Sequence, residues 1–201
     1  MTQRFLDKAY RDDTDMDRLY SDWAESYDAE LEASGYASPR RCAEALAACD
    51  APTDGTVLDF GCGTGLSGGA LKRAGFETLD GCDVNADMLA KARERGIYRN
   101  LHEIAPGSDG LPGPTPDSIA AIGVIAPGHA PPETIDLLLG ALPSGGRLVF
   151  SLNDHALAAR SFEARIGAWT DSGSARCLFR EHGPHIPAED LGATVYVLQK
   201  G

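Results

Sequence analysis

Residues 57–65 read Val57-Leu58-Asp59-Phe60-Gly61-Cys62-Gly63-Thr64-Gly65. Apolar residues that lead directly into closely spaced glycines predict a buried strand followed by a sharp turn, because glycine lets the backbone turn tightly and approach a ligand. An expected helix opens at Leu66. A glycine-rich turn that joins a strand to a helix and binds nothing is the alternative interpretation, and the loop taken alone leaves it open.

The spacing of the glycines argues against a dinucleotide site. A dinucleotide-binding loop follows the pattern Gly-x-Gly-x-x-Gly, and Leu66 occupies the position of its third glycine. Here the third glycine comes one residue earlier, at Gly65. Asp59 places an acid two residues before the first glycine, where it would repel a pyrophosphate and attract a cationic amine.

A second acid follows at the distance that a nucleoside site requires. Residues 76–82 predict another short strand, and Asp83 stands at its end. In doubly wound folds an acid about 20 residues beyond the glycine loop binds the ribose hydroxyls. Asp80 is the weaker candidate because it lies within the strand. A helix expected from about residue 86 leaves helix capping as a second role for Asp83, and the two roles can coexist.

These features together resemble motif I of the class I S-adenosylmethionine (SAM) dependent methyltransferases. Residues 83–89, Asp83-Val84-Asn85-Ala86-Asp87-Met88-Leu89, resemble the D-x-S-x-x-M-L signature of this family. The turn at residues 143–146 is similar to its L-x-P-G-G turn. Gly96-Ile97-Tyr98 and Gly128-His129 resemble most the methyltransferase-like proteins of the Williams–Beuren group. The resemblance runs from about residue 6 to residue 199 and implies that SAM is the cofactor.

The resemblance also implies which residues contact the cofactor. Residues 20–28 are similar to the Y-x-x-W-A-x-x-Y-D segment that covers the cofactor in relatives, although aromatic residues on one helical face are also typical of a core. Relatives carry an adenine-binding aspartate after the third strand, and Glu103 is the nearest acid here. The implied cofactor-binding residues are Tyr20, Trp23, Tyr27, Asp59, Gly61, Cys62, Gly63, Asp83, Val84, Met88, Glu103, Ile104 and Ile125.

Strands and helices alternate beyond residue 50, which predicts an α/β fold with a mostly parallel sheet. We expect strands at 56–60, 76–82, 98–103, 118–125 and 147–152, and helices at 66–74, 86–95, 132–142 and near 154–169. Two last strands, near 175–181 and 193–199, predict an antiparallel hairpin at the edge. The expected domain is a single Rossmann-like, seven-stranded methyltransferase sheet with helices on both faces. Residues 1–50 form its helical lid, in which Ser38 caps a helix that continues through Pro39, and residues 51–201 form its core.

Composition restricts the partners and the location. The net charge is −12, from 30 acidic and 18 basic residues. Binding of a polyanion depends on Lys and Arg, so DNA, RNA and acidic membranes are disfavoured. We find no apolar run long enough for a membrane span and no apolar signal core at the N-terminus. The five cysteines lack paired Cys-x-x-Cys spacing, which predicts reduced thiols and no metal site. We expect a cytoplasmic monomer or homodimer that acts on a small molecule.

One histidine is the candidate catalytic residue. Methyl transfer from a sulfonium is an in-line displacement, in which an enzyme supplies mainly proximity and alignment. A base is required only where the nucleophile carries a proton. His129 follows the fourth strand, on the edge where open α/β sheets bind substrates, and a solvated loop histidine is the alternative. Asn153, Asp154 and His155 follow the fifth strand on the same edge, where Asn153 could instead cap a helix.

Three functions fit the sequence to different degrees. The favoured one is a SAM-dependent methyltransferase with a small-molecule acceptor. A SAM-binding protein without transfer activity, such as a sensor or a partner subunit, would carry the same cofactor motif. A nicotinamide or flavin oxidoreductase is disfavoured by Leu66 and Asp59.

Overall fold

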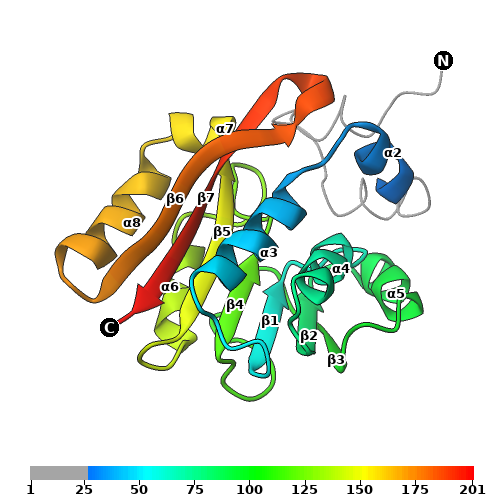
Figure 1. Ribbon diagram of the computed structural model, residues 1–201, viewed down its shortest axis with the longest axis horizontal. Helices are drawn as coiled ribbons and strands as arrows, with labels where there is room; N and C mark the ends of the chain where they lie inside the picture. The colour runs from blue at the N-terminus through cyan, green and yellow to red at the C-terminus, as the bar shows by residue number, and fades with distance from the viewer. Residues whose placement is uncertain (1–26) are drawn as a thin grey trace.

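The computed structural model describes residues 27–201 and contains one seven-stranded sheet (Figure 1). The strand order is β3-β2-β1-β4-β5-β7-β6. The first five strands are parallel, whereas β7 is antiparallel to both β5 and β6. This arrangement confirms the predicted Rossmann-like fold. The strands are β1 (Thr56–Phe60), β2 (Thr78–Asp83), β3 (Asn100–Glu103), β4 (Ser118–Ala121), β5 (Arg147–Asn153), β6 (Ala175–Ile186) and β7 (Leu191–Lys200).

Helices cover both faces of the sheet, so its inner strands are apolar at successive positions. Because neighbouring side chains on a strand point to opposite faces, Val57 joins the core beneath α3 (Ser38–Ala48) and α4 (Leu66–Arg73), and Leu58 joins the core beneath α6 (Thr134–Ala141) and α8 (Ser161–Asp171). α3 thus packs on the sheet, although it falls within the segment expected to form the lid. The remaining helices are α2 (Tyr27–Ala33), α5 (Ala86–Glu94), α7 (Asp154–Ala158) and the 3₁₀ helix η2 (Pro187–Glu189).

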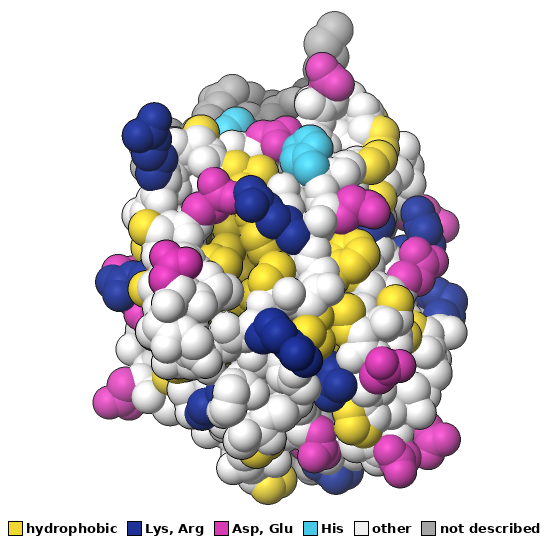
Figure 2. All heavy atoms as spheres, turned by 60° about the vertical axis from the view of Figure 1, so that its left-hand side comes forward, with side chains coloured by type: hydrophobic (Ala, Val, Ile, Leu, Met, Phe, Trp, Pro, Cys, Tyr) yellow, Lys and Arg dark blue, Asp and Glu magenta, His cyan; other side chains and the backbone are white. Residues whose placement is uncertain are grey.

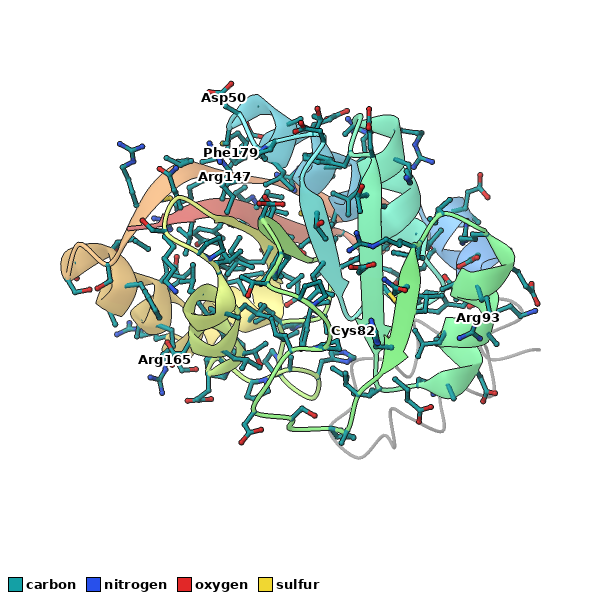
Figure 3. All side chains as sticks on the ribbon, turned by 90° about the horizontal axis from the view of Figure 1, so that it is seen from below. Asp50, Cys82, Arg93, Arg147, Arg165 and Phe179 are labelled. Atoms are coloured by element: carbon teal, nitrogen blue, oxygen red, sulfur yellow. The ribbon has the colours of Figure 1, made fainter. Side chains whose placement is uncertain are left out.

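Side chains fill both layers between the sheet and its helices (Figure 3). Cys82 is fully buried near the end of β2, whereas Arg93 and Arg165 lie at the periphery. Arg147, at the start of β5, donates from Nε to the carbonyl oxygen of Cys49 at 2.8 Å. This bond fastens the end of α3 to the amino end of the sheet, opposite the edge that carries the site.

The chain reverses its direction of travel across the sheet between β1 and β4. From the central β1 it runs outward to β2 and β3, and then returns to place β4 on the other side of β1. The loops after β1 and β4 therefore leave the sheet in opposite directions and open a crevice at the carboxyl ends of the strands. Ligands of doubly wound folds bind at this crevice.

Three local expectations were wrong. The fourth strand ends at Ala121, because Gly123 takes a positive φ of 72° and the chain turns there. The helix expected near 154–169 is broken into α7 and α8 at Ala159, whose ψ is 93°. Ser38 does not cap α3: its N-cap is Ala37, and the Ser38 hydroxyl lies 2.7 Å from His185 Nδ1.

The Ser38–His185 bond joins α3 to the C-terminal hairpin inside the protein, so its loss should destabilise the fold. His185 is 4% exposed, and burial lowers its pKa to about 4, which keeps the imidazole neutral near pH 7. For Ser38→Ala we expect the free energy of unfolding to fall by about 1–3 kcal/mol, because a buried imidazole nitrogen loses its partner. Urea unfolding at pH 7 measures the change. An unchanged midpoint would show that the bond contributes nothing.

The face that carries α8 and β6 presents charges of both signs (Figure 2). Hydrophobic side chains gather in a hollow there, with basic and acidic groups around it. Arg180 pairs with Glu163, and Arg165 pairs with Glu133 and Asp136. This face therefore has no continuous basic surface of the kind that polyanions bind. Within residues 27–201 no helix has the length and apolarity needed to cross a membrane.

Candidate active site

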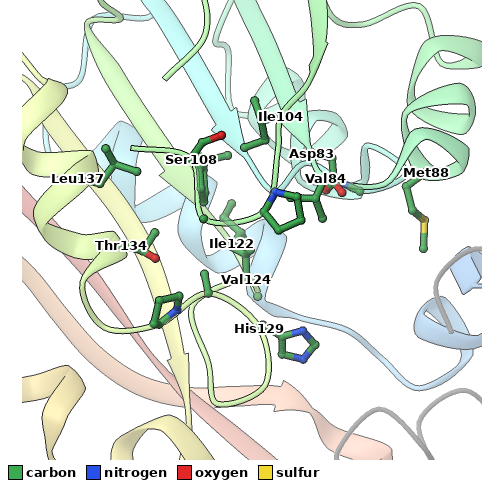
Figure 4. Close-up of a pocket in the computed structure, with 18 of the residues that line it drawn as sticks. Asp83, Val84, Met88, Ile104, Ser108, Ile122, Val124, His129, Thr134 and Leu137 are labelled. Atoms are coloured by element: carbon green, nitrogen blue, oxygen red, sulfur yellow. The ribbon is translucent and has the colours of Figure 1, made fainter. Parts of the chain in front are cut away.

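A cavity of about 580 Å³ lies at the crevice between the loops after β1 and β4 (Figure 4). Sites for small molecules and cofactors usually measure about 300–1,000 Å³. Gly61 and Gly63 line one wall, residues 122–124 line another, and the loop at 104–109 and the start of α6 complete it. The cavity is thus built on the glycine loop that follows β1.

The three glycines of the loop have different neighbours. Gly61 has a φ of 70°, and a β-carbon there would lie 2.5 Å from Cγ2 of Val124. Gly63 has a φ of 53°, lines the cavity, and would present a β-carbon to open space. Gly65 has a φ of 92° and meets Arg95 on a side that does not line the cavity. Only the first two glycines therefore shape the cavity wall.

Asp83 holds the glycine loop to the end of β2. Its Oδ2 accepts a hydrogen bond from the backbone N–H of Gly63 at 2.8 Å, and its Oδ1 accepts one from Asn85 at 3.0 Å. Asn85 itself caps α5, because its side chain accepts from the backbone N–H of Met88 at 3.0 Å. Asn85 thus caps α5, and Asp83 attaches the glycine loop to β2. Asp83 also lines the cavity.

Beside Asp83 the cavity wall is apolar. Val84 is 43% exposed, the one large hydrophobic residue with an exposed side chain in the described part of the chain. Met88 also lines the cavity, as does Ile104, whose N–H donates to the carbonyl oxygen of Asp83 at 3.0 Å. Figure 4 shows Asp83 and Val84 together with Met88 to one side of them and Ile104 above. An exposed apolar surface next to a carboxylate suits a flat base attached to a sugar.

Asp59 is buried behind the glycine loop and does not line the cavity. Its Oδ2 accepts hydrogen bonds from Ser67 Oγ and Tyr98 Oη, both at 2.7 Å. Burial raises the pKa of Asp59 to about 6, and these two bonds oppose the rise. Oδ1 has no hydrogen-bond partner within residues 27–201. The spacing of the motif predicts this acid beside a ligand amine, whereas its hydrogen bonds in the structure are with Ser67 of α4 and with Tyr98.

The other residues named from the sequence divide into three groups. Tyr27, at the start of α2, lines the cavity. Cys62 and Ile125 are buried away from the cavity, and Glu103 is exposed on β3 outside it. Burial raises the pKa of Cys62 well above its usual value, so its thiol stays protonated. Tyr20 and Trp23 lie outside the described residues.

The far end of the cavity holds the candidate catalytic histidine. His129 lines it, and in Figure 4 the ring lies below Val124, away from Met88. Burial lowers the pKa of His129, so the imidazole is neutral near pH 7 and able to accept a proton. Thr134 and Leu137 of α6 line the same cavity. The cavity therefore continues well beyond its nucleoside-like end.

Tyr36 is a cavity residue that no sequence motif predicted. It lies between α2 and α3, and a β-carbon on Gly123 would sit 2.2 Å from its hydroxyl oxygen. The His185 ring meets the Tyr36 ring edge-on at a centroid distance of 5.3 Å. Because His185 belongs to β6, far along the chain, no local sequence pattern could indicate this contact. The turn that Tyr36 contacts could be recognised in the sequence, because Gly123 follows the apolar residues of β4.

The polar residues after β5 serve the fold. Asn153 caps α7, because its side chain accepts from the backbone N–H of Ala156 at 2.9 Å. Asp154 lies 2.9 Å from His182 Nε2 and accepts from the N–H of Gly192 at 2.8 Å. Neither these two residues nor His155 line the cavity. The capping role left open for Asn153 is the one that the structure shows.

A family model described as "Methyltransferase domain" matches residues 33–195. The chain belongs to this family. The match covers the glycine loop, the Asp83 contact and the cavity lining from Tyr36 onward. With the seven-stranded fold, it identifies a class I SAM-dependent methyltransferase domain. The predicted family is therefore confirmed.

One curated relative is a methyltransferase-like protein, and solved structures share the fold. The human methyltransferase-like protein 27 is 33% identical over 131 residues, which cover 63% of this chain and 54% of that protein. The chain thus matches about half the length of this curated relative. Among solved structures, magnesium protoporphyrin IX methyltransferase from Synechocystis PCC 6803 was crystallised with bound S-adenosylhomocysteine (SAH). It has a TM-score of 0.66 at 15% identity, with 98% of both chains covered. The cyclase SpnF has a TM-score of 0.58 at 17% identity, with 81% of both chains covered.

The described residues fit SAM, the cofactor of this methyltransferase family. A carboxylate can accept about four hydrogen bonds, so the two backbone contacts of Asp83 are compatible with a ribose diol. Val84 and Ile104 offer apolar surface for adenine, and the open side of Gly63 leaves room for a chain to pass over the loop.

Proposed function

We propose that the protein transfers the methyl group of SAM to a small molecule bound in the His129 end of the cavity. One observation carries this proposal: a single cavity contains both the Asp83 end, which suits a nucleoside, and a second end lined by Tyr36 and His129. A site for the cofactor alone would not need the second end. When bound, SAM supplies an electrophilic methyl group on a sulfonium.

His129 would serve as a general base. Its neutral imidazole can accept the proton of a hydroxyl, phenol or thiol while the nucleophile forms its bond to the methyl carbon. The carbon–sulfur bond breaks as that bond forms, and its electron pair stays on sulfur. Phe60, Tyr27 and Tyr36 line the cavity with aromatic surface, which excludes water and attracts a sulfonium. The remaining task of the protein is alignment.

The cavity wall favours an acceptor without an anionic group. Its titratable side chains in residues 27–201 are those of Asp83, Asp109, Glu133, His129 and the two tyrosines, and no Lys or Arg of this part lines it. A carboxylate or phosphate on the acceptor would find acids rather than a cationic partner. We therefore propose an acceptor that has no anionic group and carries a nucleophilic oxygen or sulfur.

The second candidate is a SAM-binding protein that transfers no methyl group. A structural neighbour named as a cyclase, SpnF, has a TM-score of 0.58, so the fold by itself does not specify methyl transfer. The two candidates share the Asp83 end of the cavity and differ at the His129 end.

Transfer activity distinguishes the two candidates. We expect purified protein incubated with methyl-labelled SAM and a panel of uncharged alcohols, phenols and thiols to form one SAH for each methylated product. Mass spectrometry measures both products. Acids and phosphate esters of similar size are the matched comparison and should be poor acceptors. Tight SAH binding with no transfer to any member of a broad panel would favour the SAM-binding protein instead.

A further inference from the structure

The turn between α5 and β3 contacts the glycine loop from outside the cavity. Arg95 begins this turn, and its Nε donates to the carbonyl oxygen of Thr64 at 2.6 Å. A β-carbon on Gly65 would lie 2.9 Å from Cδ of Arg95 and 3.2 Å from Cε2 of Tyr98. A side chain on Gly65 would thus collide with Arg95. The absence of a β-carbon at Gly65 leaves the space through which Arg95 reaches Thr64.

The same guanidinium reaches α2. Nη2 of Arg95 forms an ion pair with Asp28, in the first turn of that helix. The other carboxylate oxygen of Asp28 accepts a hydrogen bond from Oγ1 of Thr64, which is 1% exposed. Figure 1 shows α2 above α4 and α5, and the bonds join it to the loop that precedes α4 and to the residue that follows α5. Three residues thus tie α2 to the loop, and Tyr27, the neighbour of Asp28, lines the cavity.

We propose that Arg95 is a positioning residue for the cofactor, because it locks α2 onto the glycine loop and so holds Tyr27 in the cavity wall. The inference rests on the proposed function only in treating this cavity as the SAM site. Arg95 itself does not line the cavity. It acts through Thr64 on one side and through Asp28 on the other.

The ion pair between Arg95 and Asp28 is partly exposed, which limits its contribution to the stability of the whole protein. The side chains of Arg95 and Asp28 are 32% and 38% exposed, and pairs this accessible contribute little to global stability and are screened by salt. α2 has seven residues and buries only Leu31 among them, so loss of these bonds should open α2 without unfolding the sheet. Each opening removes Tyr27 from the cavity and lowers the fraction of protein ready to bind.

Binding of SAH to Arg95→Met, Asp28→Asn and the double variant tests this inference. SAH carries no net charge, so the change in protein charge in these variants should not by itself alter the long-range electrostatic attraction of the ligand. Calorimetry should give roughly threefold to tenfold weaker binding for Arg95→Met, the size expected when a partly exposed, charge-assisted contact is lost. Stopped-flow mixing should locate the loss in a lower apparent association rate, because a smaller fraction of the protein is ready to bind. The double variant should bind no more weakly than Arg95→Met, because Arg95→Met already removes the ion pair that Asp28→Asn would weaken.

Lys91→Met is the matched control. Lys91 lies on α5, pairs with Glu94 at 3.9 Å, and does not line the cavity. Its substitution removes the same charge and should leave SAH affinity unchanged. Amide hydrogen exchange adds a readout that a general loss of stability would not reproduce: in Arg95→Met, exchange should accelerate within residues 27–36 and not within β1.

Two results would overturn the inference and leave the methyltransferase assignment intact: wild-type affinity for SAH in Arg95→Met, or an equal loss in Lys91→Met. Additive losses in the double variant would also overturn it, because Asp28 and Arg95 would then act separately. Failure of the wild-type protein to bind SAH would instead contradict the proposed function.

Discussion

Asp83→Ala is expected to weaken SAH binding by about 1–3 kcal/mol, or roughly fivefold to 150-fold. The substitution removes the proposed acceptor of the ribose hydroxyls. It also leaves the N–H of Gly63 without the carboxylate that lies 2.8 Å away, so the loop that shapes the cavity loses its attachment to β2. Both effects act on the same ligand, and calorimetric titration at pH 7 measures their sum.

Two further variants separate these effects. Asp83→Asn keeps one oxygen for the loop but loses the charge, so its affinity should fall between those of the wild type and Asp83→Ala. Asn85→Ala removes only the cap of α5, which should lower the free energy of unfolding by about 1 kcal/mol while SAH affinity changes little. If Asp83→Ala bound SAH as tightly as the wild type, neither a ribose contact of Asp83 nor its attachment of the loop would contribute to SAH binding.

The sequence predicted the parts of this fold that depend on local chemistry. Asp83 could be found because it follows a strand at the spacing of a nucleoside site, and the glycine loop because its three glycines follow an apolar run. The same locality explains the errors. Ser38 precedes Pro39 in a typical capping pattern, yet its hydroxyl bonds to His185 of β6, and only tertiary packing brings the two together.

The candidate site was harder to predict than the fold. Asp59 has the spacing expected of an acid that binds a ligand. In the structure, Tyr98, which follows α5 in the chain, donates a hydrogen bond to Oδ2 of Asp59. A β-carbon on Gly68 would lie 2.2 Å from the Tyr98 hydroxyl oxygen, so the glycine that permits this contact lies outside the motif. Tyr36 enters the cavity from a turn that has no motif around it. Such residues are positioned by distant strands, which one sequence does not reveal.

His129→Gln is expected to reduce kcat by about a hundredfold to ten-thousandfold with a hydroxyl acceptor, the usual range for loss of a general base. SAH affinity should change little, because His129 lies at the end of the cavity away from Asp83 and Met88. Steady-state assays with the acceptor found in the panel, together with calorimetry, measure the two quantities. His182→Gln is the control, since His182 is exposed on β6 beside Asp154 and should behave as the wild type.

The pH profile tests the same role of His129 independently. Burial lowers the pKa of His129 below its ordinary value of 6.5, so the imidazole is a base at pH 7 and becomes protonated only at lower pH. For the wild type we expect kcat/KM to be constant near neutrality and to fall on the acid side, below pH 6.5. Asp59, with a pKa of about 6, also titrates in this range and is present in both proteins. If the acid-side fall of kcat/KM persists in His129→Gln, it belongs to Asp59 or another group. If the fall disappears with the histidine, His129 is the base.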